Sequence, residues 1–263
     1  MSAAKPVTLI TGASSGIGVS LARVFAEHGH EVVIAARRAA ELSAVADAIA
    51  ASGRARPHAL AIDLGCADAS DRLADELSAR SLEPQYVVNN AGFGLLGRAA
   101  TLDRSAQRAM IDLNVGALTD LSLRFIDSLA RQRGGILNVA SIASFLPGPG
   151  MAVYHATKAY VLSFSEGLRR ELAPKGIRVT VLCPGPVLTG FQARAGAGDQ
   201  HYPRGFLRTA DQVARAGYDG LMRGRRVVVP GLQNKIVPWL PRLLPRGMLA
   251  ERVYARLRTW EDA

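Results

Sequence analysis

The sequence predicts an α/β domain built on one doubly wound parallel sheet of about seven strands, with helices on both faces. Three observations predict it: a glycine-rich turn joins an apolar run to a helical pattern near the start of the chain, short apolar runs then alternate with helical patterns up to about residue 230, and several of these runs end in polar residues. This alternation is typical of parallel sheets with helical crossovers. At 263 residues and 49% apolar content, the chain is long enough for one such domain.

The glycine-rich turn is the sequence T-G-A-S-S-G-I-G, from Thr11 to Gly18. It follows the apolar run 7–10 and precedes a helical pattern that ends at Gly29. Glycines allow a tight turn and let a diphosphate approach main-chain N–H groups at a helix N-terminus. A purely structural loop is the alternative, but strand, turn, helix and terminal glycine occur in the order that a nucleotide site requires.

Two arginines follow the second apolar run, 32–36. In nucleotide-binding units of this kind an acidic residue near this position binds the ribose 2′-hydroxyl, whereas arginine accommodates a 2′-phosphate. Arg37 and Arg38 therefore favour NADP(H) over NAD(H). The alternative is an exposed charge pair in a loop.

The remaining runs continue the alternation up to a helix from Thr209 to Arg223 and a seventh strand over 227–229. Polar or loop-forming residues follow four of the strands and lie on two of the helices. They are Asp63-Leu64 after 58–62, Asn89 to Gly92 after 87–88, Ser141 after 136–139, Pro184-Gly185 after 177–182, Asn114 in a long helix 103–131, and Tyr154 with Lys158 in a helix 153–172.

Tyr154 and Lys158 are four residues apart, so their side chains share one helix face. A phenol ionises near pH ~10, and a neighbouring ammonium group favours the phenolate. Such a tyrosine can exchange a proton with an alcohol or a carbonyl. The pair alone is a weak signal, because this spacing is common on helix surfaces.

Taken together and in this order, the motifs resemble the short-chain dehydrogenase/reductase family. The resemblance covers residues 6–190 and, more weakly, continues to Pro230. It implies a Rossmann domain with strand order 3-2-1-4-5-6-7 and NADP(H)-dependent interconversion of a carbonyl and a secondary alcohol. The rival function is a non-catalytic NADP(H)-binding regulator or scaffold on the same fold.

The resemblance also implies roles for single residues. Tyr154 would be the general acid/base, Ser141 would bind the substrate oxygen, Lys158 would hold the nicotinamide ribose and lower the pKa of Tyr154, and Asn114 would support a water linked to Lys158. His155 receives no catalytic role. The residues expected to bind the cofactor are Gly12, Ser14, Ser15, Gly16, Ile17, Gly18, Arg37, Arg38, Asp63, Leu64, Asn90, Ala91, Gly92, Tyr154, Lys158, Pro184, Gly185, Val187 and Thr189. Among these, Ser14, Arg37 and Arg38 are the candidates for the 2′-phosphate.

Composition argues against several other functions. The lone Cys66 and Cys183 indicate neither a disulfide framework nor a metal site. The net charge of +10 comes from scattered arginines without interleaved aromatics, which argues against nucleic-acid binding. The first six residues hold no apolar signal region and no run of eighteen apolar residues occurs, so we expect a cytoplasmic protein without a transmembrane segment.

We expect residues 1–230 to form the catalytic domain, with a substrate loop at 190–207, and residues 231–263 to form an apolar and basic extension that packs on it. The stretch from Thr189 to Phe206 and the tail from Gly231 are predicted to form a mobile lid that favours a bulky hydrophobic substrate. A subunit interface is the alternative for the tail, and peripheral membrane contact is less favoured. By resemblance, helices 103–131 and 153–172 would assemble a homo-oligomer.

Overall fold

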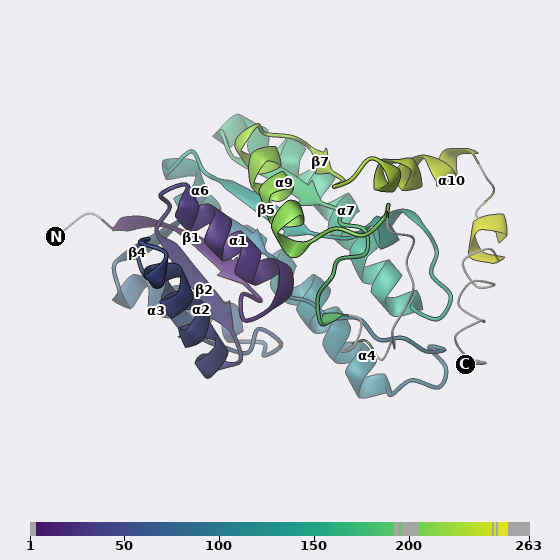
Figure 1. The fold of residues 1–263 in the computed structure, drawn as a ribbon, viewed down its shortest axis with the longest axis horizontal. Coiled ribbons are helices and arrows are strands. Elements are labelled where there is room, and N and C mark those ends of the chain that lie inside the picture. The colour runs from purple at the N-terminus through teal and green to yellow at the C-terminus, as the bar shows by residue number, and fades with distance from the viewer. Residues whose placement is uncertain (1–3, 192–194, 196–204, 244, 246, 252–263) are drawn as a thin grey trace.

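The computed structural model describes residues 4–191, 195, 205–243, 245 and 247–251. Its centre is a parallel seven-stranded sheet with the order β3-β2-β1-β4-β5-β6-β7, as the sequence predicts (Figure 1). The strands are β1 (Lys5–Thr11), β2 (Val32–Ala36), β3 (His58–Ala61), β4 (Leu82–Asn89), β5 (Gly135–Val139), β6 (Arg178–Leu182) and β7 (Val227–Val228).

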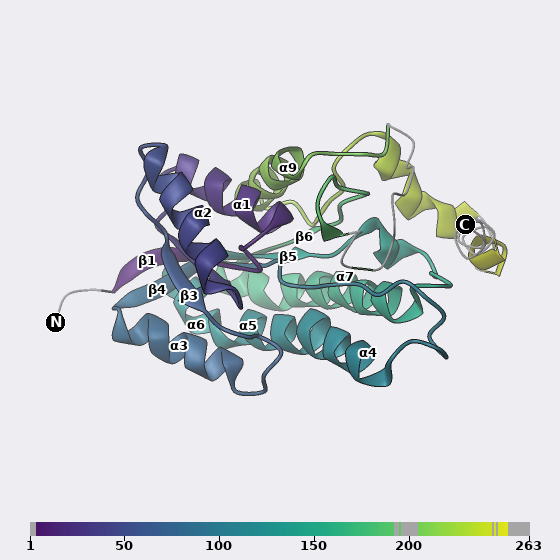
Figure 2. The same cartoon turned by 60° about the horizontal axis from the view of Figure 1, so that its bottom comes forward.

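Helices cover both faces of the sheet (Figure 2). One face carries α1 (Gly16–Glu27), α2 (Ala39–Ala51) and α9 (Ala210–Met222). The other face carries α3 (Ala69–Ala79), α4 (Arg104–Ile111), α5 (Leu118–Arg124), α6 (Ile126–Arg131) and α7 (Ala152–Leu172). Short helices η2 (Ile142–Phe145), η3 (Ala173–Lys175), η4 (Gln233–Trp239) and α10 (Leu240–Leu243) complete the described chain.

The core consists mainly of two apolar layers, one on each side of the sheet. Phe25 of α1 and Leu42 of α2 belong to the first layer, and Leu73 of α3 and Leu129 of α6 belong to the second. All five residues of β2 are buried, which is expected of a parallel strand covered on both faces. The apolar runs of the sequence therefore form strands because both of their faces must leave water.

The parallel arrangement brings all the carboxyl ends of the strands to one edge of the sheet. The chain moves outward from β1 to β3 on one side and then returns to β4 on the other side of β1. Ligands of open α/β sheets bind in the crevice where the strand order reverses in this way. The polar strand ends singled out in the sequence are therefore collected around the ends of β1 and β4.

The prediction of one long helix over 103–131 is wrong in one respect: in the structure this segment consists of several shorter helices. Asp103 caps α4, its Oδ1 accepting from the Ala106 amide at 2.7 Å. A π-helical turn, η1 (Asp112–Ala117), separates α4 from α5, and Phe125 separates α5 from α6. The wider π turn holds Asn114, whose side chain bonds to the neighbouring loop, and π turns often occur at functional sites.

Of the predictions for the C-terminal third of the chain, the structure confirms one and leaves another outside the described residues. Thr209 does cap α9, in a capping box with Gln212. Most of the substrate loop and residues 252–263 of the extension lie outside the described residues, so the mobility of the lid stays a prediction. Among the residues that the structure describes, no helix is long and apolar enough to cross a membrane.

Candidate active site

A cavity of about 810 Å³ runs along the carboxyl ends of the strands. Its wall is built by the glycine-rich turn, the ends of β2 to β6, the first turns of α7, the segment after β6 and part of the C-terminal extension. All the predicted site residues line it except Gly18 and Asn114. The structure thus joins motifs from Gly12 to Thr189 into one site.

The glycine-rich turn is fixed against the end of β4. The Thr11 hydroxyl accepts hydrogen bonds from the main-chain amides of Asn90 and Ala91, both at 3.0 Å, and the Asn90 side-chain amide donates to the Thr11 carbonyl at 2.9 Å. Gly12 has a φ of +65°, and a Cβ there would lie 2.8 Å from the Ala91 Cα. Only glycine allows this contact, so the glycine-rich turn and the Asn89 to Gly92 motif hold each other in position.

Gly18 has a packing role in the structure. A Cβ at this position would lie 2.4 Å from the Gly12 carbonyl oxygen, inside normal contact distance. The third glycine of the turn therefore lets the first turn of α1 approach the strand end closely, and it does not form the cavity wall.

The two arginines lie at the end of β2 and are exposed. Arg38 donates to the Ser14 hydroxyl oxygen at 3.1 Å and pairs with Glu41 at 3.0 Å. Arg37 lines the same end of the cavity. Three of the predicted phosphate-binding residues are thus adjacent, near the N-terminus of α1, where partial positive charge also favours an anion.

Tyr154 and Lys158 face the other end of the cavity. The Lys158 Nζ lies 5.8 Å from the centre of the Tyr154 ring and donates to the Val139 carbonyl at 2.9 Å. Lys158 is almost completely buried, and this burial lowers its pKa to about 8. A cation held at this cost, without a carboxylate among its described contacts, is a typical sign of a functional group.

Ser141 and Asn114 have different surroundings. Ser141 lines the cavity between β5 and η2, where its Oγ accepts from the Ala143 amide at 3.1 Å. Asn114 lies behind the wall, and its side chain bonds to the main chain of Phe93 and to the Thr157 hydroxyl. The described bonds of the Asn114 side chain therefore fix the loop after β4, and its water-binding role stays a prediction.

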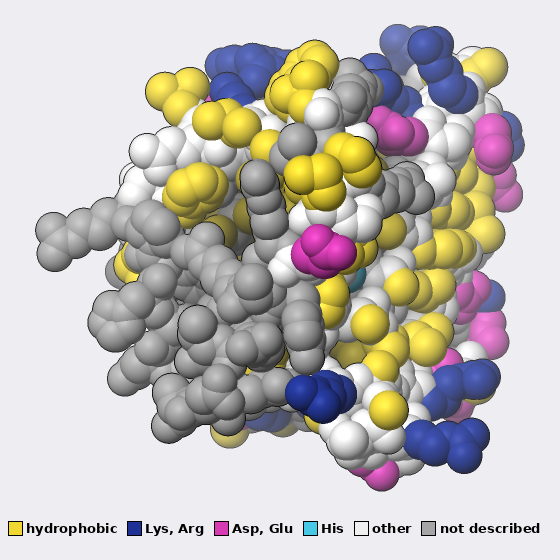
Figure 3. Space-filling view, turned by 90° about the vertical axis from the view of Figure 1, so that its right-hand side faces the viewer, with side chains coloured by type: hydrophobic (Ala, Val, Ile, Leu, Met, Phe, Trp, Pro, Cys, Tyr) yellow, Lys and Arg dark blue, Asp and Glu magenta, His cyan; other side chains and the backbone are white. Residues whose placement is uncertain are grey.

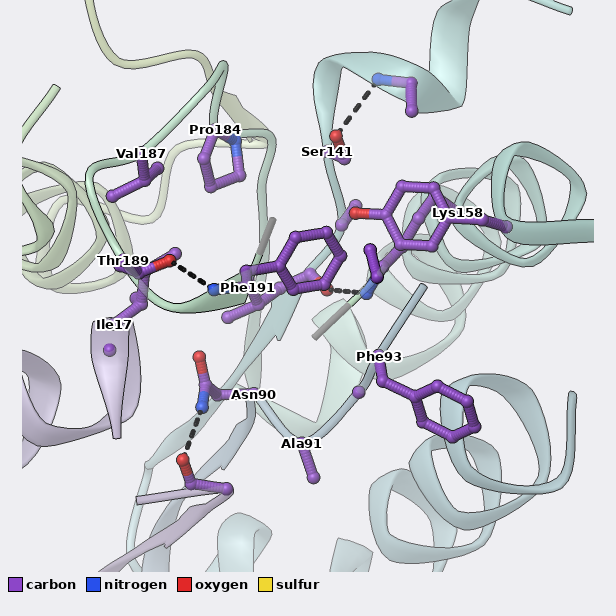
Figure 4. Close-up of a pocket in the computed structure, with 18 of the residues that line it drawn as sticks. Ile17, Asn90, Ala91, Phe93, Ser141, Lys158, Pro184, Val187, Thr189 and Phe191 are labelled. Carbon is purple, nitrogen blue, oxygen red and sulfur yellow. Dashed lines mark hydrogen bonds between the residues drawn. The ribbon is translucent and has the colours of Figure 1, made fainter. Parts of the chain in front are cut away.

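Part of the apolar wall around Tyr154 is not among the residues expected from the sequence. Phe93 and Met151 form a cluster with Tyr154 and Phe191, whose ring centre lies 5.6 Å from that of Tyr154. Phe191 points into the cavity from the segment after β6 (Figure 4). Phe93 directly follows the N-N-A-G motif, so its position next to a predicted site residue could have indicated this role.

His155 also lines the cavity, and the structure supports the view that it is a space-filling polar residue. Its Nδ1 lies 2.8 Å from the Leu146 carbonyl, and its ring packs on Gly148. Burial lowers its pKa below the ordinary value, with main-chain hydrogen bonds acting in the opposite direction. His155 is therefore neutral at pH 7 and holds the loop after η2.

The C-terminal extension reaches the cavity as well. Ile236, Val237 and Leu240 line it beside Phe206, so the apolar surface foreseen in the tail does meet the cleft. Other hydrophobic side chains of the extension, including Trp239 and Leu243, are exposed. Figure 3 shows several groups of hydrophobic side chains on this side of the molecule. In the described part of the chain, no cluster of His, Cys, Asp or Glu could hold a metal ion.

Comparison with known proteins places this architecture in a family. Residues 6–200 match the model of the short chain dehydrogenases, and the chain belongs to this family. It is an oxidoreductase of the dehydrogenase/reductase type, as the sequence predicts.

Three similar proteins illustrate the relationship. A serine 3-dehydrogenase of Agrobacterium fabrum is 34% identical over 80% of this chain and 85% of its own. A short-chain dehydrogenase from Sphingobium yanoikuyae, solved in complex with NADPH, is 33% identical with a TM-score of 0.79, covering 88% of this chain and 90% of that one. A bulky-bulky ketone specific alcohol dehydrogenase from Comamonas testosteroni is 30% identical with a TM-score of 0.75 and covers 87% of both chains. The NADPH complex supports the predicted nicotinamide cofactor.

The residues present fit such a dinucleotide. The tight glycine turn at the start of α1 suits a diphosphate, and the Ser14–Arg38 pair suits a phosphate on the adenine ribose. Lys158 and Tyr154 occupy the opposite end of the same cavity. The site therefore offers an anion-binding end and a proton-transfer end, as a phosphorylated dinucleotide and a carbonyl compound would require.

Proposed function

We propose that this protein is an NADP(H)-dependent oxidoreductase that interconverts a carbonyl group and a secondary alcohol on a hydrophobic substrate, with Tyr154 as the general acid/base. One observation carries the proposal: a single cavity joins the glycine turn and the arginine pair to Ser141, Tyr154 and Lys158. We also propose that the enzyme is cytoplasmic, as expected from the sequence.

The cofactor supplies the hydride that adds to the carbonyl carbon during reduction. The glycine turn and the 2′-phosphate candidates would hold its adenine half, while Lys158 and the segment Pro184 to Thr189 would hold its nicotinamide half. The loop that Asn90 ties to the glycine turn closes the cavity from the β4 side. These contacts would orient the reacting carbon of the nicotinamide. Correct orientation of two bound reactants contributes much of the rate acceleration in such reactions.

Proton transfer is the task of the side chains at the other end. Ser141 donates a hydrogen bond to the carbonyl oxygen, and the Tyr154 hydroxyl gives that oxygen a proton as negative charge develops on it. The ammonium group of Lys158 favours the resulting phenolate, which is then reprotonated. In the oxidation direction the phenolate removes the proton from the alcohol.

The apolar character of the wall supports a hydrophobic substrate. Phe93, Met151 and Phe191 surround the Tyr154 ring, and Ile236 and Val237 face the cavity from the extension. The Comamonas neighbour, described as specific for bulky-bulky ketones, supports a large ketone. Serine, the substrate in the name of the Agrobacterium relative, is small and charged and therefore fits this apolar lining less well.

Replacement of Tyr154 tests the mechanism. Tyr154→Phe removes the proton donor and little of the contact surface, so turnover of a ketone by NADPH should fall by at least about 100-fold. The affinity for NADPH, measured by fluorescence titration, should stay within about twofold because the ring remains. Tyr160→Phe is the matched control, since Tyr160 lies on the same helix but is exposed. Near-normal turnover by the Tyr154 variant would overturn the mechanism.

We also propose a homo-oligomer formed through the helical face that contains α4, α5 and α7. Ile111, Leu123 and Tyr160 are each about 40% exposed or more on these helices. The Tyr160 ring stacks on Phe164 and its hydroxyl lies 3.0 Å from that of Thr119, so neighbouring helices share one apolar surface. Exposed hydrophobic surface of this kind favours association.

A further inference from the structure

The C-terminal extension forms one side of the cavity at its substrate end. We call the segment Gln233–Leu240 the C-terminal wall. Gln233, Ile236, Val237 and Leu240 line the cavity, while the intervening Asn234 is fully buried. This pattern puts mostly apolar side chains next to the segment that follows β6.

Asn234 fixes the wall in place. Its Nδ2 donates to the Pro230 carbonyl at 2.8 Å and to the Phe206 carbonyl at 3.1 Å. The amide group also packs flat on Gly185, where a Cβ would lie 2.5 Å from both its nitrogen and its oxygen. One buried side chain thus joins the wall, the end of the substrate loop and the turn after β6.

The amide oxygen of Asn234 is buried and has no hydrogen-bond partner among the described residues. An unpaired buried acceptor is unfavourable for stability. Asn234 therefore keeps two hydrogen bonds that position the wall and leaves one buried acceptor unpaired.

The opposite side of the substrate end is also apolar. Phe93, Met151 and Phe191 pack around Tyr154 in a separate cluster. A carbonyl group at Tyr154 therefore has an apolar surface on each side, one from this cluster and one from the C-terminal wall.

Apart from Lys158, the charged side chains of the described lining lie away from the substrate end. Arg37, Arg38 and Asp63 lie at the ends of β2 and β3. The strand order places β2 three positions from β5, a separation of about 14 Å at the usual ~4.8 Å between strands. The remaining charged residue is Lys158, which is buried and bonded to the Val139 carbonyl. The described wall therefore offers no exposed cation to a substrate anion.

We propose that the C-terminal wall, positioned by Asn234, determines specificity: it makes the enzyme select uncharged ketones with apolar groups on both sides of the carbonyl and reject anionic ones. This inference rests on the proposed function, because it concerns the same site. The physical reason is that a carboxylate brought between two apolar surfaces loses its hydration without gaining a partner.

The first test compares two probes that share the same ketone and differ in charge and by one methyl group, 4-oxo-4-phenylbutanoate and its methyl ester. With NADPH, we expect kcat/KM for the ester to exceed that for the acid by about 100-fold or more. Equal values would overturn the inference but leave the proposed function intact. Absence of turnover with any neutral ketone would overturn both.

The second test gives the wall a cation. Gln233→Arg should raise kcat/KM for the acid relative to the ester by about tenfold, because a guanidinium pairs with a carboxylate. Leu232→Arg is the matched control: it adds the same charge next to the wall, at a residue that is highly exposed and does not line the cavity. The ratio should not change in this control. An equal rise in both variants would show a general charge effect and contradict the inference.

The third test concerns Asn234 as a positioning residue. Asn234→Ala should raise KM for the ester by about tenfold while kcat changes less than twofold, and Asn234→Ser, which keeps a donor, should recover part of the loss. A merely structural role would lower kcat and the melting temperature without this separation and would contradict the assignment. If the alanine variant does not fold, the KM of the serine variant tests the role of Asn234, and the acid-to-ester ratio of kcat/KM in Gln233→Arg tests the role of the wall.

Discussion

Replacement of Lys158 by methionine should separate stability from function. Methionine has nearly the length of lysine but carries no charge, so it fits the buried position under Tyr154. The pKa of Lys158 is lowered from 10.5 to about 8 by burial. At about 1.36 kcal/mol per pKa unit, the folded protein keeps the charged form at a cost of about 3 kcal/mol at pH 7.

The variant also loses one interaction, the hydrogen bond from Nζ to the Val139 carbonyl. Such a bond contributes about 1 kcal/mol. Lys158→Met should therefore stabilise the protein by about 2 kcal/mol at pH 7. With an unfolding entropy of about 2.1 cal/mol/K per residue over 263 residues, this corresponds to a rise of about 4 °C in the melting temperature. Ketone reduction should be lost in the same variant.

The stabilisation should depend on pH with a definite sign. Between about pH 8 and 10.5 the unfolded chain binds a proton at Lys158 that the folded chain has released. The wild type therefore gains stability as the pH rises through this range, and the methionine variant does not. The difference in free energy of unfolding between the variant and the wild type should have its full value of about 2 kcal/mol at pH 7 and fall to near zero by about pH 9.5.

Thermal unfolding followed by circular dichroism at pH 7 and at pH 9.5 measures this difference. Lys175→Met is the matched control, because Lys175 is exposed and its replacement should change neither the stability nor its pH dependence. A methionine variant that is less stable than the wild type by the same amount at both pH values would refute the reasoning, since it would show that Lys158 is not held at an electrostatic cost.

Three further predictions follow from the site and its surroundings. Arg38→Ala should weaken NADPH binding by about tenfold and NADH binding by less than twofold, because a guanidinium pairs only with the extra phosphate; equal losses, or the same effect in the exposed Arg56→Ala control, would exclude Arg38 as the phosphate ligand. Phe191→Ala should raise KM for bulky ketones at least about fivefold and leave small ones nearly unchanged, because it removes one apolar surface beside Tyr154; steady-state kinetics on both substrate sizes measures this. Leu123→Glu should convert the oligomer to a monomer in light scattering, and an unchanged mass would place the interface elsewhere.

The sequence determined most of the fold through local pattern. Apolar runs of strand length, helical periodicity and terminal glycines depend on neighbours within one or two turns, so they can be read without long-range contacts. The strand order 3-2-1-4-5-6-7 and about half of the cavity lining followed from the sequence motifs, because the carboxyl ends of parallel strands must meet at one edge. All the predicted site residues except Gly18 and Asn114 line the cavity, and their binding and catalytic roles stay predictions.

Tertiary structure alone decided the features that depend on distant contacts. The π turn around Asn114, the Ser14–Arg38 pair and the burial of Lys158 arise from packing between segments far apart in the chain. The clearest case is Asn234, which no pattern marks in the sequence and which bonds to Phe206 and packs on Gly185, 49 residues earlier. A polar residue in a proline-punctuated tail has no periodicity to reveal it, because its position depends on a cavity wall that exists only once the sheet has formed.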